Sequence, residues 1–163
     1  YLTGLPNARS LFLHLDGEIA RARRNNGQIA VLVCDLDGFK QVNDRFGHLE
    51  GNKVLKLVAR GFRECCREYD YVARMGGDEF VLVLPGMAAK ELDTKVKRLM
   101  HIAAEAGRDG VGEQILSASV GTAHFPEDGP DAETLLAEAD KRMYRVKQAH
   151  RLTEPRTERS FDW

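Results

Sequence analysis

An unbroken apolar run at residues 29–34, with the sequence IAVLVC, constrains the fold most strongly. A strand that has one face in water alternates apolar and polar residues, whereas a strand buried on both faces is apolar throughout. We therefore expect a central strand here, in a sheet whose two faces are both covered by other elements. Asp35-Leu36-Asp37-Gly38 follows directly, so the end of this buried strand carries two carboxylates.

Two shorter β-rich runs, residues 71–74 and 80–84, are separated by a segment that contains Gly76 and Gly77. A glycine pair between two such runs predicts a β-hairpin with the glycines in its turn. Asp78 and Glu79 follow the glycines and therefore lie at this turn. If a hairpin strand pairs with the strand at 29–34, these two acids and Asp35 converge at one edge of the sheet.

Apolar residues recur at helical spacing elsewhere; Leu11, Leu15 and Ile19, for example, share one side of a helix. The periodicity predicts helices at residues 11–24, 54–66, 88–106 and 132–148, and a further strand region at 115–124. The resulting order, αβαββαβα, predicts an α+β fold of the ferredoxin-like type with a leading helix. In such a fold, helices back a central antiparallel sheet.

The chain has 163 residues, 24 of them basic and 25 acidic, and a formal net charge of −1. Its length suits one domain, and its balanced charge gives no long-range attraction to nucleic acid or to an anionic membrane. No apolar run approaches the roughly 20 residues of a membrane span. We expect a domain over residues 1–152 and a polar tail, or a linker to a missing domain, over 153–163.

The three cysteines, Cys34, Cys65 and Cys66, limit the options further. An odd number without a C-x-x-C pair is atypical of a disulfide framework or a zinc site, and it favours a reducing cytoplasm. Cys34 belongs to the apolar run and is expected in the core. We expect the domain to be cytoplasmic, as part of a larger membrane-anchored or soluble protein.

The acidic residues at the predicted sheet edge indicate a particular chemistry. Clustered carboxylates raise one another's pKa unless a cation neutralises them, and oxygen ligands of this kind suit Mg²⁺ or Mn²⁺. Two such ions, roughly 3.5–4 Å apart, can activate an attacking hydroxyl and hold a leaving phosphate. The chain has neither a G-x-x-x-x-G-K-[ST] loop nor an H-E-x-x-H motif. This disfavours a P-loop phosphate site and a zinc metalloprotease site. Metal-dependent phosphate chemistry is favoured over acids that are merely solvated.

The segment Arg74-Met75-Gly76-Gly77-Asp78-Glu79-Phe80 resembles the signature of the GGDEF family of diguanylate cyclases. Other family motifs match in the same order, at residues 2–7, 35–40, 43–44, 46–48, 119–121 and 139–147. The resemblance covers almost the whole chain. It implies a palm-type, nucleotide cyclase-like sheet, and a reaction that joins two GTP molecules into cyclic di-GMP with release of pyrophosphate.

The resemblance also implies the metal ligands and the catalytic residues. Asp35, the carbonyl of Leu36, Asp78 and Glu79 match the positions that hold Mg²⁺ or Mn²⁺ in the family. Asp78 and Glu79 would be catalytic. The position of Asp78 is the one usually proposed to accept the proton of the 3′-hydroxyl group.

Phosphate binding is implied at two places. The backbone of Gly38, Phe39 and Lys40 would hold the β- and γ-phosphates, and a glycine suits this close approach. The side chain of Phe39 is expected in the core rather than against a base. Lys147 and Arg151 are four residues apart, so they share a helix face and could bind the same triphosphate. Apart from the resemblance, that pair reads as an ordinary solvated helix end.

Base recognition is implied at Asn43, with His48 nearby, although an asparagine before aspartate is more often a turn or cap residue.

Asn52 stands where the family has an aspartate that accepts hydrogen bonds from guanine. An amide offers one oxygen acceptor and an NH₂ donor, and a poorly paired polar edge costs about 1–3 kcal/mol. Our hypothesis is that Asn52 relaxes purine selection, so that ATP is used and some cyclic GMP-AMP is made. The alternative is that Asn52 reads guanine with lower affinity. The chain also departs from the family at His150, where glycine is usual.

Arg67 and Asp70 resemble the R-x-x-D inhibitory site of the family, at the expected spacing before Gly76. In that interpretation they bind the product, cyclic di-GMP, which then inhibits the enzyme. The alternative is a surface ion pair that contributes little to stability.

Catalysis by such a domain implies a two-fold homodimer, because each domain holds one of the two GTP molecules that react. No nucleic acid or membrane partner is expected for the domain itself. Two other functions remain open from the sequence. One is a receptor that binds cyclic di-GMP without turnover, and the other is a GTP-binding regulatory domain attached to a phosphodiesterase.

Overall fold

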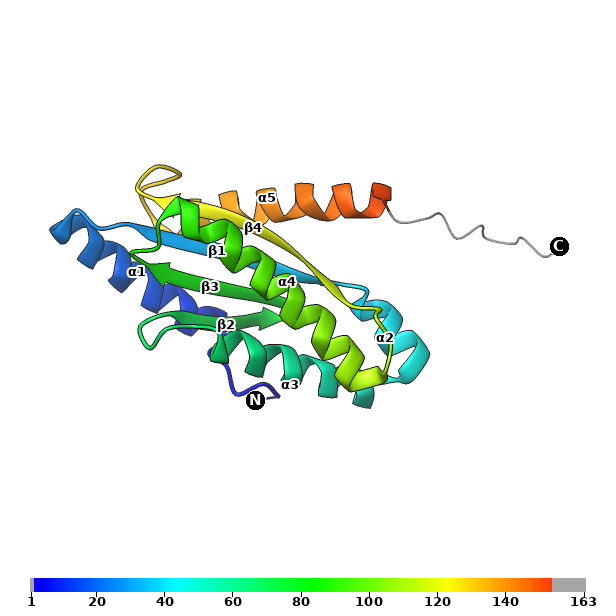
Figure 1. Cartoon of the computed structure of the whole chain (residues 1–163). Coiled ribbons are helices and arrows are strands. Elements are labelled where there is room, and N and C mark those ends of the chain that lie inside the picture. Colours follow the sequence, from blue (N-terminus) through cyan, green and yellow to red (C-terminus); the bar gives the residue numbers. More distant parts are fainter. Residues whose placement is uncertain (1, 154–163) are drawn as a thin grey trace.

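The computed structural model describes residues 2–153. Its elements, in chain order, are α1 (Ala8–Asn25), β1 (Ile29–Asp37), α2 (Phe39–Phe46), α3 (His48–Glu64), β2 (Tyr71–Gly76), β3 (Glu79–Pro85), α4 (Ala89–Val111), β4 (Ser117–Phe125) and α5 (Ala132–Thr153). The strands form one antiparallel sheet in the order β2-β3-β1-β4, flanked by helices (Figure 1). The α+β fold with a central antiparallel sheet is therefore confirmed, as is the hairpin of β2 and β3.

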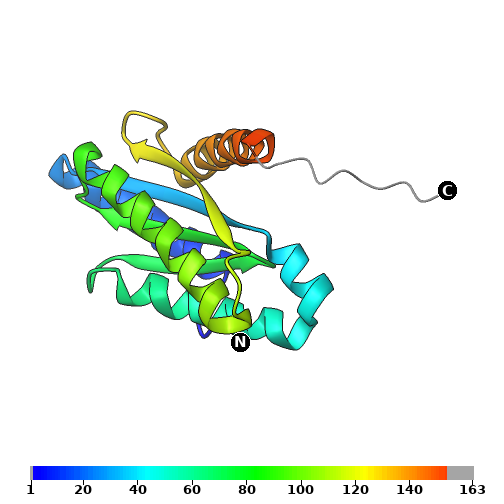
Figure 2. The same ribbon diagram turned by 45° about the vertical axis from the view of Figure 1, so that its right-hand side comes forward.

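The sheet lies between two helical layers, which explains the apolar run in β1. Ala30, Leu32 and Cys34 pack with α2, α3 and α4, whereas Ile29, Val31 and Val33 pack with α1 and α5. All six side chains are buried. Figure 2 shows α4 and α5 on either side of β4. A strand with helices on both faces has no position for an exposed polar side chain, so it is apolar along its length.

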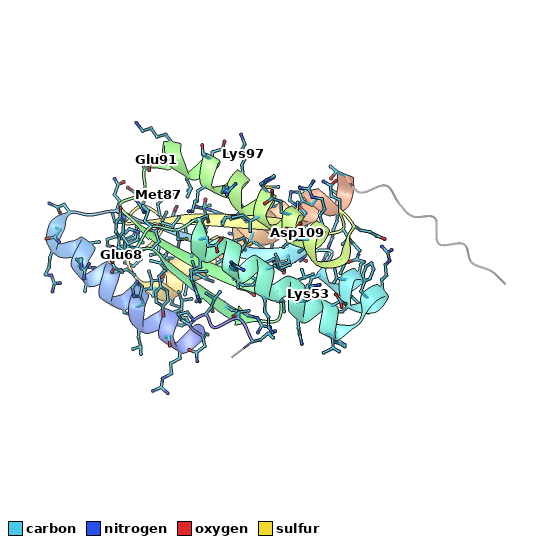
Figure 3. All side chains as sticks on the ribbon, turned by 60° about the horizontal axis from the view of Figure 1, so that its bottom comes forward. Lys53, Glu68, Met87, Glu91, Lys97 and Asp109 are labelled. Carbon is cyan, nitrogen blue, oxygen red and sulfur yellow. The ribbon has the colours of Figure 1, made fainter. Side chains whose placement is uncertain are left out.

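The outer surface of the α3–α4 layer is charged. Lys53 on α3 and Lys97 and Asp109 on α4 are exposed, and they project from the ribbon in Figure 3. Across residues 2–153, none of the helices combines the length and the apolar character that crossing a membrane requires.

The predicted helix order was wrong at one point, because the segment before residue 54 is helical. Residues Phe39–Phe46 form α2, and α3 begins at His48 rather than at residue 54. Phe39 and Val42 are the buried residues of α2, and Gly38 and Gly47, both with positive φ, bound it. Phe39, Val42 and Phe46 follow helical spacing, but eight residues are fewer than the window in which a helical period can be recognised.

Helix α5 continues to Thr153, beyond the end predicted at residue 148. Arg151 and Leu152 are therefore helical. The remainder of the expected tail, residues 154–163, lies outside the described residues.

Helix α5 packs tightly against β4 at Gly121. A Cβ atom on Gly121 would lie 2.0 Å from the carbonyl oxygen of Ala139 and 2.1 Å from the backbone nitrogen of Met143. Arg142 fixes the same contact, because it donates to the carbonyl oxygen of Thr122 at 2.8 Å. Only a residue without a side chain permits this approach. The contact therefore fixes the position of α5 relative to β4.

We predict that G121A destabilises the protein by at least about 2 kcal/mol, because the added methyl group forces α5 away from β4. The matched control is G17A, in which the new Cβ of an exposed residue of α1 meets nothing within 4 Å. G17A should raise the free energy of unfolding by about 0.5–1 kcal/mol, because alanine favours a helix interior. Urea unfolding of both variants checks this. Equal stability of G121A and the wild type would contradict the docking geometry.

Candidate active site

The predicted acidic residues meet where β1 and the β2–β3 hairpin end. β1 pairs with β3 so that Asp35 lies opposite Glu79. The backbone N–H of Leu36 donates to the carbonyl oxygen of Asp78 at 3.2 Å, which fixes the hairpin turn against the end of β1. Asp35, Asp78 and Glu79 therefore lie close together, as the hairpin prediction implied.

Lys147 reaches this acidic cluster from α5. Its Nζ donates to Oδ2 of Asp35 at 2.7 Å and lies 3.6 Å from Oδ1 of Asp37. Burial favours the neutral amine, but the hydrogen bond to Asp35 and the charges of Asp35, Asp37 and Asp78 outweigh it, so the pKa of Lys147 is raised. The cluster therefore contains a charged ammonium group.

The ammonium does not neutralise the cluster completely. Burial and the charge of the neighbouring Asp35 carboxylate raise the pKa of Asp78 to about 6. Burial also raises the pKa of Glu79, with the charges of Asp140 and Asp35 adding to the effect. Both shifts reflect negative charge crowded into a partly buried site, which further positive charge would stabilise.

The chemistry of this cluster fits a divalent cation. Oδ1 of Asp35 is buried and has no hydrogen-bond partner among the described residues. The available donors are carboxylate and carbonyl oxygens, which are the ligands that Mg²⁺ and Mn²⁺ prefer. Within residues 2–153, no three His, Cys, Asp or Glu side chains are already gathered into a metal-binding group. The donors are thus adjacent but not preassembled, and Lys147 occupies Oδ2 of Asp35.

Asp37 differs from Asp35 because donors from β4 and α5 lie against its carboxylate. The Oγ of Ser119 lies 2.9 Å from Oδ1 and 2.7 Å from Oδ2 of Asp37. Nδ1 of His150 lies 2.9 Å from the same Oδ2 and 3.0 Å from Oγ of Ser119. Ser119 is completely buried. Of the two acids that end β1, Asp35 is the one with a buried oxygen that lacks a hydrogen-bond partner among residues 2–153.

A cavity of about 210 Å³ opens beside the acidic cluster, lined by Leu36, Asp37, Gly38, Phe39, Lys40, Gln41, Asp78, Lys147, His150 and Arg151. Three of the lining side chains, those of Lys40, Lys147 and Arg151, are basic. The first turn of α2 also lines it, and the N–H groups of a first helical turn lack intrahelical partners. Free N–H groups together with basic side chains make this wall suitable for phosphate.

Gly38 is required by the geometry of this wall. Its φ is +87°, and a Cβ atom there would lie 2.2 Å from the carbonyl oxygen of Ile115. The chain therefore turns tightly between β1 and α2, where any larger residue would clash. Phe39, the next residue, is buried in the core as predicted, so its side chain is not available to stack on a base.

The residues implied in base recognition lie on α2 and α3, outside the lining of this cavity. Asn43 contacts Gly51 so closely that a Cβ on Gly51 would lie 1.9 Å from Oδ1 of Asn43. That oxygen is buried without a hydrogen-bond partner among the described residues. Asn52 is half-buried beside Gly51, and His48 is exposed at the start of α3. The helix pair thus places Asn43 against the turn of α3 that carries Asn52.

Arg67 and Asp70 bind each other at the other end of the sheet. Nη2 of Arg67 donates to Oδ1 of Asp70 at 2.8 Å and to the carbonyl oxygen of Pro85 at 3.0 Å. The side chain of Asp70 is completely buried, and that of Arg67 is 35% exposed. Pro85 ends the seven-residue β3 that Glu79 begins, so the pair lies about 20 Å from the acidic cluster.

His150 and its partners were not predicted as site residues. Ser119 belonged to a recognised motif, and His150 stood out only as a departure from the family. Nothing in the one-dimensional spacing relates these residues to Asp37, because 82 and 113 positions separate them from it. The contacts depend on the pairing of β1 with β4 and on the docking of α5.

Comparisons with known proteins give one consistent result. The model of the family "Diguanylate cyclase, GGDEF domain" matches residues 1–153. The chain is 39% identical over 151 residues to the diguanylate cyclase DgcP of Pseudomonas aeruginosa, an alignment that covers 92% of this chain and 22% of DgcP. It is 38% identical over 152 residues to the diguanylate cyclase DosC of Escherichia coli, over 92% of this chain and 33% of DosC. The chain thus spans a fifth to a third of the length of these relatives.

Solved structures agree with these relatives. A sensory box/GGDEF family protein from Caulobacter crescentus is 36% identical, with a TM-score of 0.81 over 91% of this chain and 96% of that one. The GGDEF domain of DgcB from the same organism, in complex with c-di-GMP, is 28% identical, with a TM-score of 0.77 over 91% of this chain and 89% of that one. The expected nucleotide cyclase-like palm fold is confirmed. The chain belongs to the GGDEF domain family of diguanylate cyclases.

Proposed function

We propose that this domain condenses two GTP molecules into cyclic di-GMP and releases pyrophosphate. The observation that carries the proposal is the partly neutralised acidic cluster beside a basic cavity at the start of α2. One feature suits a divalent cation and the other suits a triphosphate, and the reaction needs both together. Membership in the family, and relatives that are named diguanylate cyclases, support the same conclusion.

Asp35, the carbonyl of Leu36, Asp78 and Glu79 would hold Mg²⁺ or Mn²⁺. A cation bound there supplies positive charge to the phosphate oxygens and lowers the repulsion among the carboxylates. The free Oδ1 of Asp35 and the raised pKa values of Asp78 and Glu79 support this assignment.

The triphosphate would lie along the wall formed by α2 and α5. The backbone N–H groups of Gly38, Phe39 and Lys40 donate to the β- and γ-phosphates, and Lys147 and Arg151 pair with the same phosphates from α5. Both side chains line the cavity from successive turns of α5, which supports this arrangement.

The reaction follows from this placement. The 3′-hydroxyl oxygen of one GTP attacks the α-phosphorus of the other, and Asp78 accepts the hydroxyl proton. The bond from the α-phosphorus to the bridging oxygen breaks, and pyrophosphate leaves. The same exchange in the opposite direction closes the ring. Because each domain binds one GTP, two copies must face each other, and their proximity supplies much of the rate.

Guanine would be read by Asn43 and Asn52, with His48 nearby. The juxtaposition of Asn43, Gly51 and α3 supports a base site at this helix pair. Asn52 presents one acceptor where two guanine N–H donors need partners, so the site discriminates less strongly against adenine.

Arg67 and Asp70 would bind cyclic di-GMP as an inhibitory site, about 20 Å from the catalytic cluster along β3. Arg67 is partly exposed and already oriented by Asp70. Product bound there would control the enzyme without competing for the GTP site.

A regulatory domain that binds nucleotide without turnover is the second candidate. The observation in its favour is that the carboxylates are not preassembled and that Lys147 occupies an oxygen of Asp35. One relative, 35% identical over 150 residues, is the cyclic di-GMP phosphodiesterase PdeR of Escherichia coli.

Turnover separates these candidates. With GTP and Mg²⁺, the wild-type protein should form cyclic di-GMP and pyrophosphate, and D78A should lower the rate at least about 100-fold, because the base is lost. The control is D109A, at an exposed residue of α4 (Figure 3), which should keep the wild-type rate. Nucleotide binding without product in the wild type would favour the regulatory candidate, and full activity of D78A would overturn the catalytic assignment.

Repulsion within the cluster should be visible in stability. Without divalent cations, D78N should unfold at a temperature a few degrees above that of the wild type, because one of the crowded carboxylates is gone. Mg²⁺ should raise the unfolding temperature of the wild type and have little effect on D78N. Scanning calorimetry with and without Mg²⁺ measures both. An equal response of the two proteins to Mg²⁺ would contradict the proposed ligands.

The effect of Asn52 can be read from the products. A mixture of GTP and ATP should yield some cyclic GMP-AMP with the wild type. N52D should raise the preference for GTP by about tenfold or more, since a carboxylate accepts both guanine N–H groups. N25D, at an exposed position at the end of α1, is the control and should leave the product ratio unchanged. Cyclic di-GMP alone from the wild type would remove the hypothesis.

A further inference from the structure

His150 lines the cavity, yet the proposed reaction gives it no role. It lies on α5, three residues after Lys147, and its side chain is 33% exposed. Nδ1 points inward, to Oδ2 of Asp37 at 2.9 Å and to Oγ of Ser119 at 3.0 Å. A single histidine therefore connects α5 to the ends of β1 and β4.

The donors and acceptors in this group can be assigned by elimination. An ionised carboxylate only accepts, so the hydroxyl proton of Ser119 is donated to Asp37. The Oγ of Ser119 then faces His150 with a lone pair. Both neighbours of Nδ1 accept, so Nδ1 carries a proton and donates. Because one ring nitrogen meets both Ser119 and Asp37, and Ser119 is buried, the group is no nucleophilic triad, which needs both ring nitrogens.

The position of Asp37 makes these hydrogen bonds important for phosphate binding. Asp37 directly precedes Gly38, at the turn that leads into the first turn of α2. Its Oδ1 lies 3.6 Å from Nζ of Lys147. A carboxylate here that lacked other partners would attract Lys147 and repel an incoming phosphate. Ser119 and His150 instead supply donors from the side of the sheet and α5.

We propose that His150 is a positioning residue for the triphosphate of the substrate. It holds Asp37 against β4 through Nδ1, so that Asp37 does not compete with the phosphates for Lys147 and the N–H groups of α2. This inference rests on the proposed function of the cavity as the triphosphate site. It adds one property: the affinity for the β- and γ-phosphates depends on a hydrogen bond that does not touch the nucleotide.

Three substitutions at His150 separate this role from others. The amide nitrogen of asparagine can take the place of Nδ1 and donate to Asp37, whereas the amide of glutamine reaches only the place of Nε2. The probe is 3′-deoxyguanosine triphosphate with Mg²⁺, which lacks the attacking hydroxyl, so calorimetry reads binding without turnover. H150A and H150Q should weaken binding about tenfold, and H150N should bind within about twofold of the wild type.

Two controls accompany these variants. Guanosine monophosphate, which has no β- or γ-phosphate, should bind all variants as it binds the wild type. H101A removes another histidine paired with a carboxylate on a helix, His101 with Glu105 at 2.8 Å, and should bind the triphosphate as the wild type does. In turnover, H150A should raise KM for GTP and leave kcat within about twofold, because the base and the cation site are untouched.

Three other outcomes would each overturn the positioning role of His150 or the proposed function. Wild-type affinity of H150A for the triphosphate would overturn the positioning role and leave the proposed function intact. Rescue by H150Q but not by H150N would show that Nε2 acts on the nucleotide directly, which also overturns it. If the wild type itself bound no triphosphate with Mg²⁺, the proposed function would fail, and this inference with it. Thermal unfolding confirms that each variant is folded.

Discussion

The contact between Lys147 and Asp35 joins the two halves of the site. It spans 2.7 Å between α5 and the end of β1, where the hairpin brings two further carboxylates. One ammonium group does not offset the cost of these charges, because burial and then the neighbouring carboxylates raise the pKa of Asp78 and of Glu79. The protein thus carries a local electrostatic cost, which a cation would relieve and which is typical of functional sites.

The rest of the fold serves to bring these groups together. The antiparallel pairing of β1 with β3 sets Asp35 opposite Glu79. The close approach at Gly121 fixes the position of α5, and with it that of Lys147, relative to the sheet. The two acids that end β1 then acquire different roles through their partners. Asp37 is held by donors, whereas Asp35 keeps a free oxygen. Two acids two residues apart can therefore differ in function without any difference in residue type.

The sequence predicts those parts of this structure that depend on local pattern. The apolar run at 29–34 and the glycine pair at 76–77 led to β1, to the hairpin and to the convergence of the acids. Helix α2 was missed because its eight residues are fewer than the window in which a helical period can be recognised. The contacts of His150 were missed for another reason: they span more than a hundred positions and exist only once β4 and α5 have docked. Contacts between residues so far apart in the sequence depend on tertiary structure, and local sequence patterns do not reveal them.

The central claim is that the acidic end of the sheet holds a divalent cation beside a triphosphate. A crystal structure with Mn²⁺ and 3′-deoxyguanosine triphosphate, with the metal located by its anomalous signal, tests this directly. The account predicts Mn²⁺ coordinated by oxygens of Asp35 and Asp78, with Lys147 moved from Asp35 to a phosphate. A metal bound elsewhere, with the contact between Lys147 and Asp35 unchanged beside the nucleotide, would contradict it.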